Sequence, residues 1–348
     1  MQFWTDERPR ENCIVTVHLG VARGRYAALI DAELFLPESW DADRERCREA
    51  DVPDGMGHRA KWRIAFGQVL NARLAGFALD WLTFDEGYGS KPGFLDGLGL
   101  LGLSYVGEVP RSFSCFTREP AAGEGGSRAD DLARHSPVFH GQAWQEVTLP
   151  RQTLGPQTWQ ARMAPAWVRH SDGVGVARRW LMVARHGPTG EEKYFICGGV
   201  EAGLETRMRV GFTRHNVEHG FRLAKTELGF GHYEGRSYVG LMRHMTLCLV
   251  TLGFVAGQAA GLRGGKSGGD GGAGVPCAEP RVPDLGAGAW RGGGAGGPRG
   301  GDDPVPPAAE PGRTRITPAP WRGVAAGAST RPKTQTAETT ASRTPVAL

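Results

Sequence analysis

The stretch Phe212–Leu247 combines charged residues with an apolar stripe, and its spacing predicts a helix. At about 100° per residue, Arg214, Glu218 and Lys225 lie within about 40° of one another on such a helix. Apolar side chains recur alongside them, so the charged trio borders the buried face. An i,i+4 ion pair could simply stabilise the helix by about 0.3–0.5 kcal/mol. A carboxylate at the rim of a core, flanked by two cations, also suits a catalytic site.

Two kinds of chemistry fit Glu218. His215, Glu218 and His219 spell H-x-x-E-H, the inverted zinc-protease motif, in which two histidines hold the metal and the glutamate is the base. Alternatively, Glu218 is one of several carboxylates that hold Mg²⁺ for phosphoryl transfer on nucleic acid, while Arg214 and Lys225 grip phosphates. The zinc motif needs a third ligand, and the acids far downstream fall in a Gly/Pro-rich segment. The sequence therefore favours the magnesium chemistry.

Two further candidates lie outside this stretch. The apolar run FALDWLTF predicts a strand that ends at Asp85, and the carboxyl end of a strand is the usual place for a site in an α/β sheet. Trp180 lies beside Arg178 and Arg179 in the run RRWLMVARH, a pairing suited to stacking on an unpaired base. The apolar residues that follow make a core tryptophan the alternative.

The elements that must position these residues follow a definite order. The runs NCIVTVHLG and RYAALIDAELFLP predict an antiparallel pair, and HRAKWRIAFGQVLNARLAG predicts a helix. The strand ending in Asp85 follows, then a weak helix (PGFLDGLGLL) and another strand (LSYVGEVP). After a polar loop, short strand-like runs predict a β-rich insertion, which precedes the helix with Glu218 and a buried apolar helix at Met245–Ala256. This order is that of an RNase H-like α/β fold. Asp85 and Glu218 are 133 positions apart (218 − 85), so only folding could bring them together.

Several phrases in this order resemble DDE-type insertion-sequence transposases. They are IDAELFLPESW, WLTFDEGYG, KPGFL, VEHGFRLAKTELGFGHYEGRS and RHMTL, and the similarity runs from about Asn12 to about Ala256. The family carries its catalytic Glu in a Y-x2-R-x3-E-x6-K signature. The resemblance implies a mixed RNase H-like sheet, three carboxylates that bind two Mg²⁺ ions, and cleavage and joining of double-stranded transposon-end and target DNA. It also implies a homodimer in a synaptic complex.

The resemblance assigns roles residue by residue. Asp85 corresponds to the second Asp and Glu218 to the Glu, so both are expected to be catalytic metal ligands. Arg214 and Lys225 correspond to the Arg and Lys of the signature and are expected to contact DNA. The Tyr position falls on Gly211, which removes one expected phosphate contact.

Both ends of the chain depart from the family pattern. The family's first Asp lies on a strand well upstream of NCIVTV, whereas eleven residues precede Asn12 here and the segment around Asp6 does not resemble a strand. We therefore expect the central first strand and its carboxylate to be missing and the chain to be an inactive, truncated transposase. A non-catalytic DNA-binding remnant is the alternative. From Leu262 onward, the Gly/Pro-rich composition predicts a disordered tail.

These boundaries divide the chain into four parts. Residues 1–118 are the first part of the catalytic core, 119–200 the loop and β-rich insertion, 201–262 the last core helices, and 263–348 the tail. Residues 1–262 carry 30 basic and 30 acidic residues, but 151–262 carry 14 against 8. The basic second half suits a surface that faces phosphates.

Cysteine use and hydropathy bear on the compartment. The six cysteines form no C-x-x-C pair, which suggests reduced thiols in a cytosolic protein rather than disulfides or a zinc ribbon. The run Met245–Ala256 is shorter than the roughly 20 residues that a membrane span needs. The sequence therefore predicts a cytoplasmic, nucleoid-associated protein of bacterial type without a membrane partner.

Overall fold

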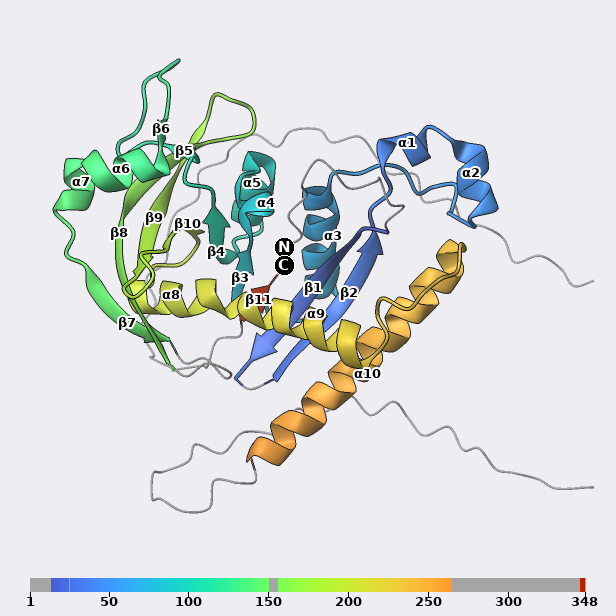
Figure 1. Ribbon diagram of the computed structural model, residues 1–348. Coiled ribbons are helices and arrows are strands. Elements are labelled where there is room, and N and C mark those ends of the chain that lie inside the picture. The colour runs from blue at the N-terminus through green and yellow to red at the C-terminus, as the bar shows by residue number, and fades with distance from the viewer. Residues whose placement is uncertain (1–13, 25, 150–155, 265–344, 348) are drawn as a thin grey trace, which may run out of the picture. The chain divides into compact units, whose positions relative to one another are not determined.

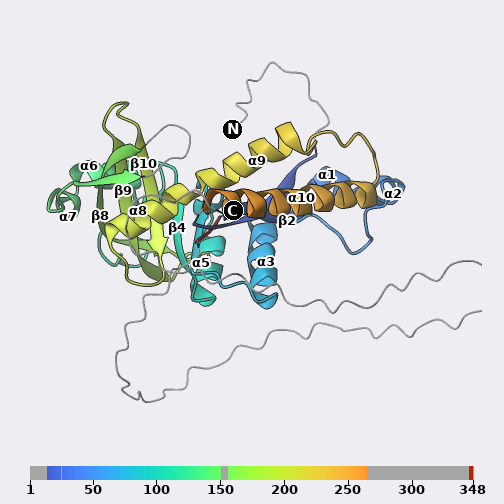
Figure 2. The ribbon, with the colours of Figure 1, turned by 90° about the horizontal axis from the view of Figure 1, so that it is seen from below.

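One mixed sheet organises the molecule. The computed structural model describes residues 14–24, 26–149, 156–264 and 345–347. Nine strands follow the order β2-β1-β11-β3-β4-β10-β9-β8-β7, and β5 and β6 form a separate small pair (Figure 1). Helices α3 and α5 cover one face of the sheet, while α8, α9 and α10 cover the other (Figure 2). This α/β architecture is RNase H-like, as the sequence predicts.

The elements have the following bounds. The strands are β1 (Thr16–Arg23), β2 (Tyr26–Leu34), β3 (Trp81–Phe84), β4 (Ser104–Val109), β5 (Ser114–Cys115), β6 (Ser127–Arg128), β7 (Gln145–Leu149), β8 (Gln157–Arg169), β9 (Val176–His186), β10 (Glu192–Gly198) and β11 (Pro345–Ala347). The helices are α1 (Glu38–Asp41), α2 (Arg44–Glu49), α3 (Lys61–Leu74), α4 (Glu86–Gly89), α5 (Pro92–Leu100), α6 (Ala129–His135), α7 (Pro137–His140), α8 (Leu204–Thr213), α9 (His215–Glu227) and α10 (Tyr238–Gly264).

The first hairpin and its crossover helix confirm the sequence prediction. β1 and β2 pair antiparallel over their whole length, and Gly24 takes a φ of +58° in the turn between them. The apolar face of α3, with Ile64 and Val69, packs into the main core. The buried Gln68 side chain donates a 2.9 Å hydrogen bond to the backbone carbonyl of Val17, which fixes α3 against β1.

The parallel pair β3–β4 places the ends of two strands side by side. Phe84 is in register with Gly107, so Asp85 and Glu108, the next residues, reach the same edge of the sheet. Gly107 is required there, because a Cβ at this position would lie 1.8 Å from Cε2 of the buried Phe84 ring.

β1 and β3 do not pair with each other in the described part of the chain. β11 lies between them, antiparallel to β1 (Val21↔Val346) and parallel to β3 (Leu82↔Val346). The expected absence of a first strand upstream of Asn12 concerns residues that lie outside the described ranges. The prediction of disorder is wrong for Arg263 and Gly264, which end α10, and for Pro345–Ala347, which form β11. Asp6 and most of the Gly/Pro-rich tail lie outside the described residues.

The predicted β-rich insertion continues the main sheet. β10 pairs antiparallel with β4, and β9, β8 and β7 follow it outward. The polar stretch before β7, read from the sequence as a loop, contains α6 and α7. These helices were missed because their apolar residues are few: Ala129, Ala133 and Phe139 are buried in the core, and Leu132 packs partly against it.

The prediction of one helix over Phe212–Leu247 is wrong. The chain breaks between α8 and α9 at Arg214, and it leaves α9 through Gly229, whose φ is +64°. α10 then begins at Tyr238. The helical periodicity continues across the first break, and Arg214 itself keeps helical dihedral angles (φ −53°, ψ −31°), so the sequence pattern could not locate it.

The apolar helix α10 is less buried than predicted. Leu241, Met245 and Leu252 pack inside the molecule, but Leu247 and Phe254 are 69% and 67% exposed. Residues 238–261 are long and apolar enough to cross a membrane. The core helix of a soluble protein passes the same test, so this property alone says nothing of a membrane.

Candidate functional site

Asp85 is held at the carboxyl end of β3. Its Oδ1 accepts hydrogen bonds from the backbone N–H of Gly87 (2.9 Å) and of Tyr88 (3.4 Å), so the carboxylate caps α4. Negative charge at a helix N-terminus is stabilised by the helix dipole. Asp85 lies at the strand end predicted from the sequence, but its Oδ1 already accepts hydrogen bonds from the first turn of α4.

Two further carboxylates share this edge. Glu108 lies at the end of β4, only 13% exposed, and its Oε1 is 2.7 Å from Nζ of Lys193 on β10. Burial raises the pKa of Glu86, and the negative charges of Glu108 and Asp85 raise it further, while Lys193 and Arg214 oppose them. The five groups therefore lie in one electrostatic neighbourhood.

Glu108 was not predicted from the sequence to belong to the site. The run LSYVGEVP was predicted to be a strand, but its glutamate was not considered, because the sequence does not reveal that this strand ends level with Asp85. The parallel register of β3 and β4 supplies that information.

Arg214 joins α9 to the sheet edge. Its Nη1 is 2.8 Å from Oε1 of Glu218, and its Nη2 is 3.6 Å from Oε2 of Glu108. The predicted proximity of Arg214 and Glu218 is thus present, and Arg214 also connects Glu218 to the carboxylates beside Asp85. Glu218 itself remains 61% exposed.

Lys225 also lies close to the first hairpin. It lies on α9 near His18 of β1, whose pKa is lowered to about 4 by burial, with a further contribution from the Lys225 charge. The His18 ring packs edge-on against Phe221, 4.9 Å between centroids. Lys225 thus shares α9 with Glu218, two turns further along the helix, and also lies near the first hairpin.

Trp180 lies on β9, separated from β3 by β4 and β10 in the sheet order. The ring is half-buried and has two cationic neighbours, with the guanidinium of Arg207 5.9 Å and that of Arg178 6.0 Å from its centroid. Arg179 points to the other face, over Tyr105 at 5.9 Å. Trp180 is thus partly core and partly surface.

The carboxylates as arranged do not fit a site for two Mg²⁺ ions. Across the described ranges, no group of three or more His, Cys, Asp or Glu side chains could hold a metal. Protein cations instead neutralise two of the carboxylates, since Arg214 contacts Glu218 and Lys193 contacts Glu108. The second expected metal ligand, Asp85, caps a helix.

The zinc alternative gains no support from the described residues. Nδ1 of His215 is 2.5 Å from the Phe212 carbonyl, and Nδ1 of His219 is 2.8 Å from Nη2 of Arg222. Each histidine of the H-x-x-E-H motif thus has a partner within its own helical region.

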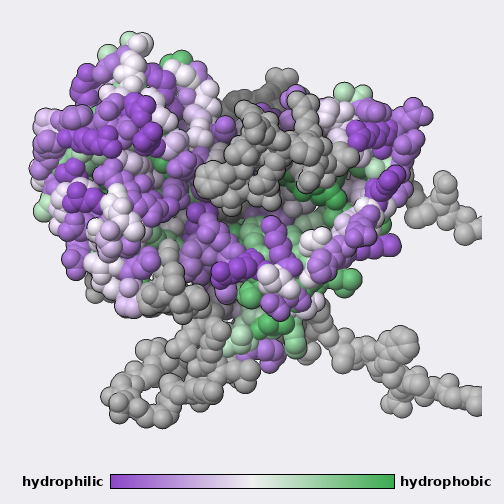
Figure 3. All heavy atoms as spheres, viewed as in Figure 1, coloured by the Kyte–Doolittle hydropathy of each residue, from purple (hydrophilic) through white to green (hydrophobic). Residues whose placement is uncertain are grey.

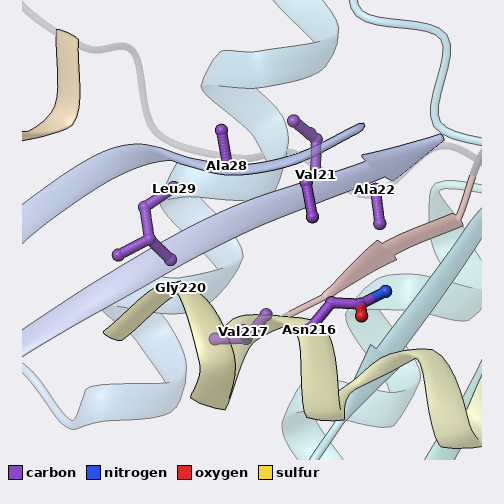
Figure 4. A pocket seen from close by; sticks show the side chains of 8 residues that line it. Val21, Ala22, Ala28, Leu29, Asn216, Val217 and Gly220 are labelled. Atoms are coloured by element: carbon purple, nitrogen blue, oxygen red, sulfur yellow. The ribbon is translucent and has the colours of Figure 1, made fainter. Parts of the chain in front are cut away.

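The small cleft between α9 and the first hairpin is not a ligand site. Its volume is about 10 Å³, and its lining is almost wholly apolar, with Val21, Leu29 and Val217 at its walls (Figure 4). The carboxylates lie outside this cleft, at the carboxyl ends of β3 and β4.

A mixed sheet with helices on both faces, an Asp at the end of a parallel strand and a Glu on a helix across the sheet define an RNase H-like nuclease fold. Residues 2–166 match the family model of the DDE superfamily endonucleases, which supports a DDE-type, transposase-like nuclease and confirms the resemblance. The match includes Asp85 and Glu108 but ends before α8, so Arg214 and Glu218 lie beyond it. No curated protein matches this chain.

Proposed function

We propose that this chain is a DDE transposase-type protein that binds double-stranded DNA at the ends of an insertion sequence and does not cut it. The observation that carries the proposal is the position of Arg214, which reaches the sheet edge beside Asp85 and Glu108 in a chain whose residues 2–166 match DDE endonucleases. The basic second half, 14 cations against 8 anions over residues 151–262, supports a phosphate-facing surface. A cytoplasmic, nucleoid-associated location follows from this function.

DNA phosphates compete well for Arg214. The Arg214–Glu218 pair joins residues one turn apart, and Glu218 is 61% exposed, so the pair contributes little stability. A guanidinium binds a phosphate through two parallel hydrogen bonds, which are stronger and more directional. Binding of the DNA backbone would therefore draw Arg214 away from Glu218.

Lys225 and Trp180 are the other proposed DNA contacts. Lys225 is exposed on α9 and can reach a phosphate without leaving an ion pair that the structure shows. Trp180 has the partly open ring and the adjacent guanidinium of Arg178 that stacking on an unpaired base needs.

We propose that Asp85 and Glu218 correspond to the catalytic, metal-binding carboxylates of a family member that cuts DNA. In this chain they are held by a helix cap and by Arg214. Mg²⁺ would supply charge stabilisation at the phosphate in such a member. The remaining role of Asp85 here is to order the α4 turn at the sheet edge.

The binding test uses the matched pair Arg214→Gln and Arg209→Gln. Arg209 forms the same i,i+4 pair with Glu205, at 2.7 Å, on α8. With the full chain and a terminal-repeat duplex, Arg214→Gln and Lys225→Ala should each lower the magnitude of the salt slope of binding by about one, and Arg209→Gln should not. Equal slopes in all variants, or no binding at roughly 100 mM salt, would overturn the proposal.

The cutting test separates binder from enzyme. The full chain should not nick the same duplex with Mg²⁺ or Mn²⁺. Nicking that disappears in both Asp85→Asn and Glu218→Gln, with DNA binding retained, would show instead an active DDE transposase.

The stacking test compares Trp180→Phe with Trp62→Phe, a tryptophan on α3. Flapped or hairpin DNA should quench the fluorescence of the wild-type chain and of Trp62→Phe, but much less that of Trp180→Phe. Equal quenching would leave Trp180 a packing residue.

A further inference from the structure

Helix α10 is apolar on two opposite sides. One side packs against β2 and α9 through Leu241, Met245 and Leu252. On the other side Leu247 and Phe254, with Val250 (65% exposed) between them, lie open to solvent. Figure 3 shows apolar residues gathered over the lower half of this helix. Neighbouring exposed apolar side chains of this kind are typical of an interaction site.

The spacing of the open side identifies the kind of partner. Its members recur at intervals of 4, 3, 4, 3 and 4 residues: Arg243, Leu247, Val250, Phe254, Gly257 and Gly261. A seven-residue repeat keeps a seam facing another helix. No Asp, Glu, Lys or Arg lies between Arg243 and Arg263, so nothing charged interrupts the seam.

The seam is complementary to itself in one orientation. In an antiparallel pair centred on Leu252, Leu247 lies opposite Gly257 of the second copy, and Val250 lies opposite its Phe254, so the leucine meets a glycine and the two inner apolar residues meet each other. Each Arg243 then lies by the C-terminal end of the other helix, where the dipole favours a cation. A parallel pair would set the two Arg243 side chains against each other. We propose that α10 pairs antiparallel with α10 of a second copy of this chain.

The geometry of α10 permits this contact and limits its strength. Figure 1 shows the C-terminal half of α10 extending beyond the ends of β1 and β2, so these strands do not cover it. Residues 243–261 span about 27 Å at about 1.5 Å per residue. A helix pair of this length buries on the order of 1,000 Å², below the standard interface size, so the dissociation constant should be micromolar.

The first test measures self-association without DNA. Sedimentation equilibrium of the full chain from roughly 1 to 300 µM should show a monomer–dimer equilibrium. Leu247→Glu should remain monomeric throughout. Leu100→Glu, the same change at an 89% exposed leucine on α5, should dimerise like the wild type. Circular dichroism and urea unfolding check that both variants fold.

The second test measures orientation by cysteine cross-linking, with Cys13→Ser and Cys277→Ser to remove thiols outside the described residues. A mixture of chains carrying Leu247→Cys with chains carrying Gly257→Cys should cross-link faster than either alone. Faster cross-linking of Leu247→Cys with itself would overturn the antiparallel pairing.

Two other occupants of the seam are outcomes that would overturn the proposal. A monomer that binds vesicles of neutral and anionic phospholipid, and loses binding in Leu247→Glu, would assign the seam to a membrane. A monomer whose amides at residues 243–261 exchange slowly, and faster after removal of residues 265–344, would assign it to the chain itself. A monomer with neither property would leave the seam without a partner.

Discussion

At the scale of single residues, positively charged side chains of the protein neutralise carboxylates at the carboxyl ends of β3 and β4. Glu108 forms ion pairs with Lys193 and with Arg214, and Arg214 forms a second ion pair with Glu218. Helical spacing predicted the Arg214–Glu218 pair because both residues lie on one short segment. It could not predict Glu108, whose place follows from the pairing of two strands.

The buried His18 side chain should make the stability of the protein depend on pH. Its folded pKa, about 4, lies below the ordinary value of 6.5, because the ring is buried beneath α9 near Lys225. At a pH between these two pKa values, His18 is protonated in the unfolded chain but neutral in the folded protein. The free energy of unfolding should therefore fall as the pH drops from about 6.5 to about 4, by at most roughly 3 kcal/mol, and this loss should level off below.

The check is urea unfolding of the wild type and of His18→Gln at pH 7 and pH 4.5. Other groups, including the nearby Asp31, titrate in both proteins, so the difference between them isolates His18. The wild type should lose more stability on acidification than the variant. Parallel losses would show that the His18 ring takes up its proton in the folded state.

Gly107 allows a steric prediction beside the candidate site. In Gly107→Ala the new Cβ would lie 1.8 Å from the Phe84 ring, and the free energy of unfolding should fall by about 3 kcal/mol or more. Gly67→Ala in α3 is the control, because a Cβ there meets nothing within 4 Å and should raise stability by about 0.5–1 kcal/mol. Urea unfolding compares the two, and a mild Gly107→Ala would show that β4 can shift away from Phe84.

At the scale of elements, the sequence predicted what alternation and helical periodicity encode. The β1–β2 hairpin, α3, β3 and β4 were all found, because their apolar faces bury against one core. The divisions among α8, α9 and α10 were not found, since the break at Arg214 keeps helical spacing on both sides. The extension of the main sheet by β7–β10 also depends on a long-range pairing, of β4 with β10, that no local pattern contains.

Asp96 makes another contact between distant parts of the sequence, because its carboxylate connects α5 to the turn after β8. Its Oδ1 is 2.5 Å from Nδ1 of His170, and its Oδ2 accepts hydrogen bonds from the backbone N–H and the hydroxyl of Ser171, both at 2.8 Å. Asp96→Asn should lower the free energy of unfolding by about 1 kcal/mol, since the site is partly solvated. It should also speed amide exchange at residues 170–175.

The control for this prediction is Asp172→Asn. Asp172 accepts hydrogen bonds from Val174 and Gly175 within the same turn and makes no bridge to α5. Hydrogen exchange of α5 should therefore change only in Asp96→Asn. Unchanged exchange of α5 in both variants would mean that the apolar packing of Phe94 and Leu98 alone holds this helix.

At the scale of the whole molecule, the sheet has two parts joined by a short strand. β2 and β1 form one part, and β3, β4 and β10 to β7 form the other. β11 pairs with two residues of β1 and three of β3, although β1 has eight residues. The family pattern predicts a strand between β1 and β3. Local sequence patterns could not show that β11 lies there, because the pairing joins residues that are far apart in the chain.

The last prediction tests whether β11 completes the sheet. Proline has no backbone N–H to donate to a neighbouring strand. Val346→Pro should therefore remove one or two backbone hydrogen bonds and lower the free energy of unfolding by about 1–3 kcal/mol. The opened edges of β1 and β3 should exchange their amide hydrogens faster and promote aggregation on concentration. Thr334→Pro, outside the described residues, is the control and should leave stability unchanged. If Val346→Pro unfolds like the wild type and β1 and β3 keep their protection, the interval between them must be filled by a segment other than β11.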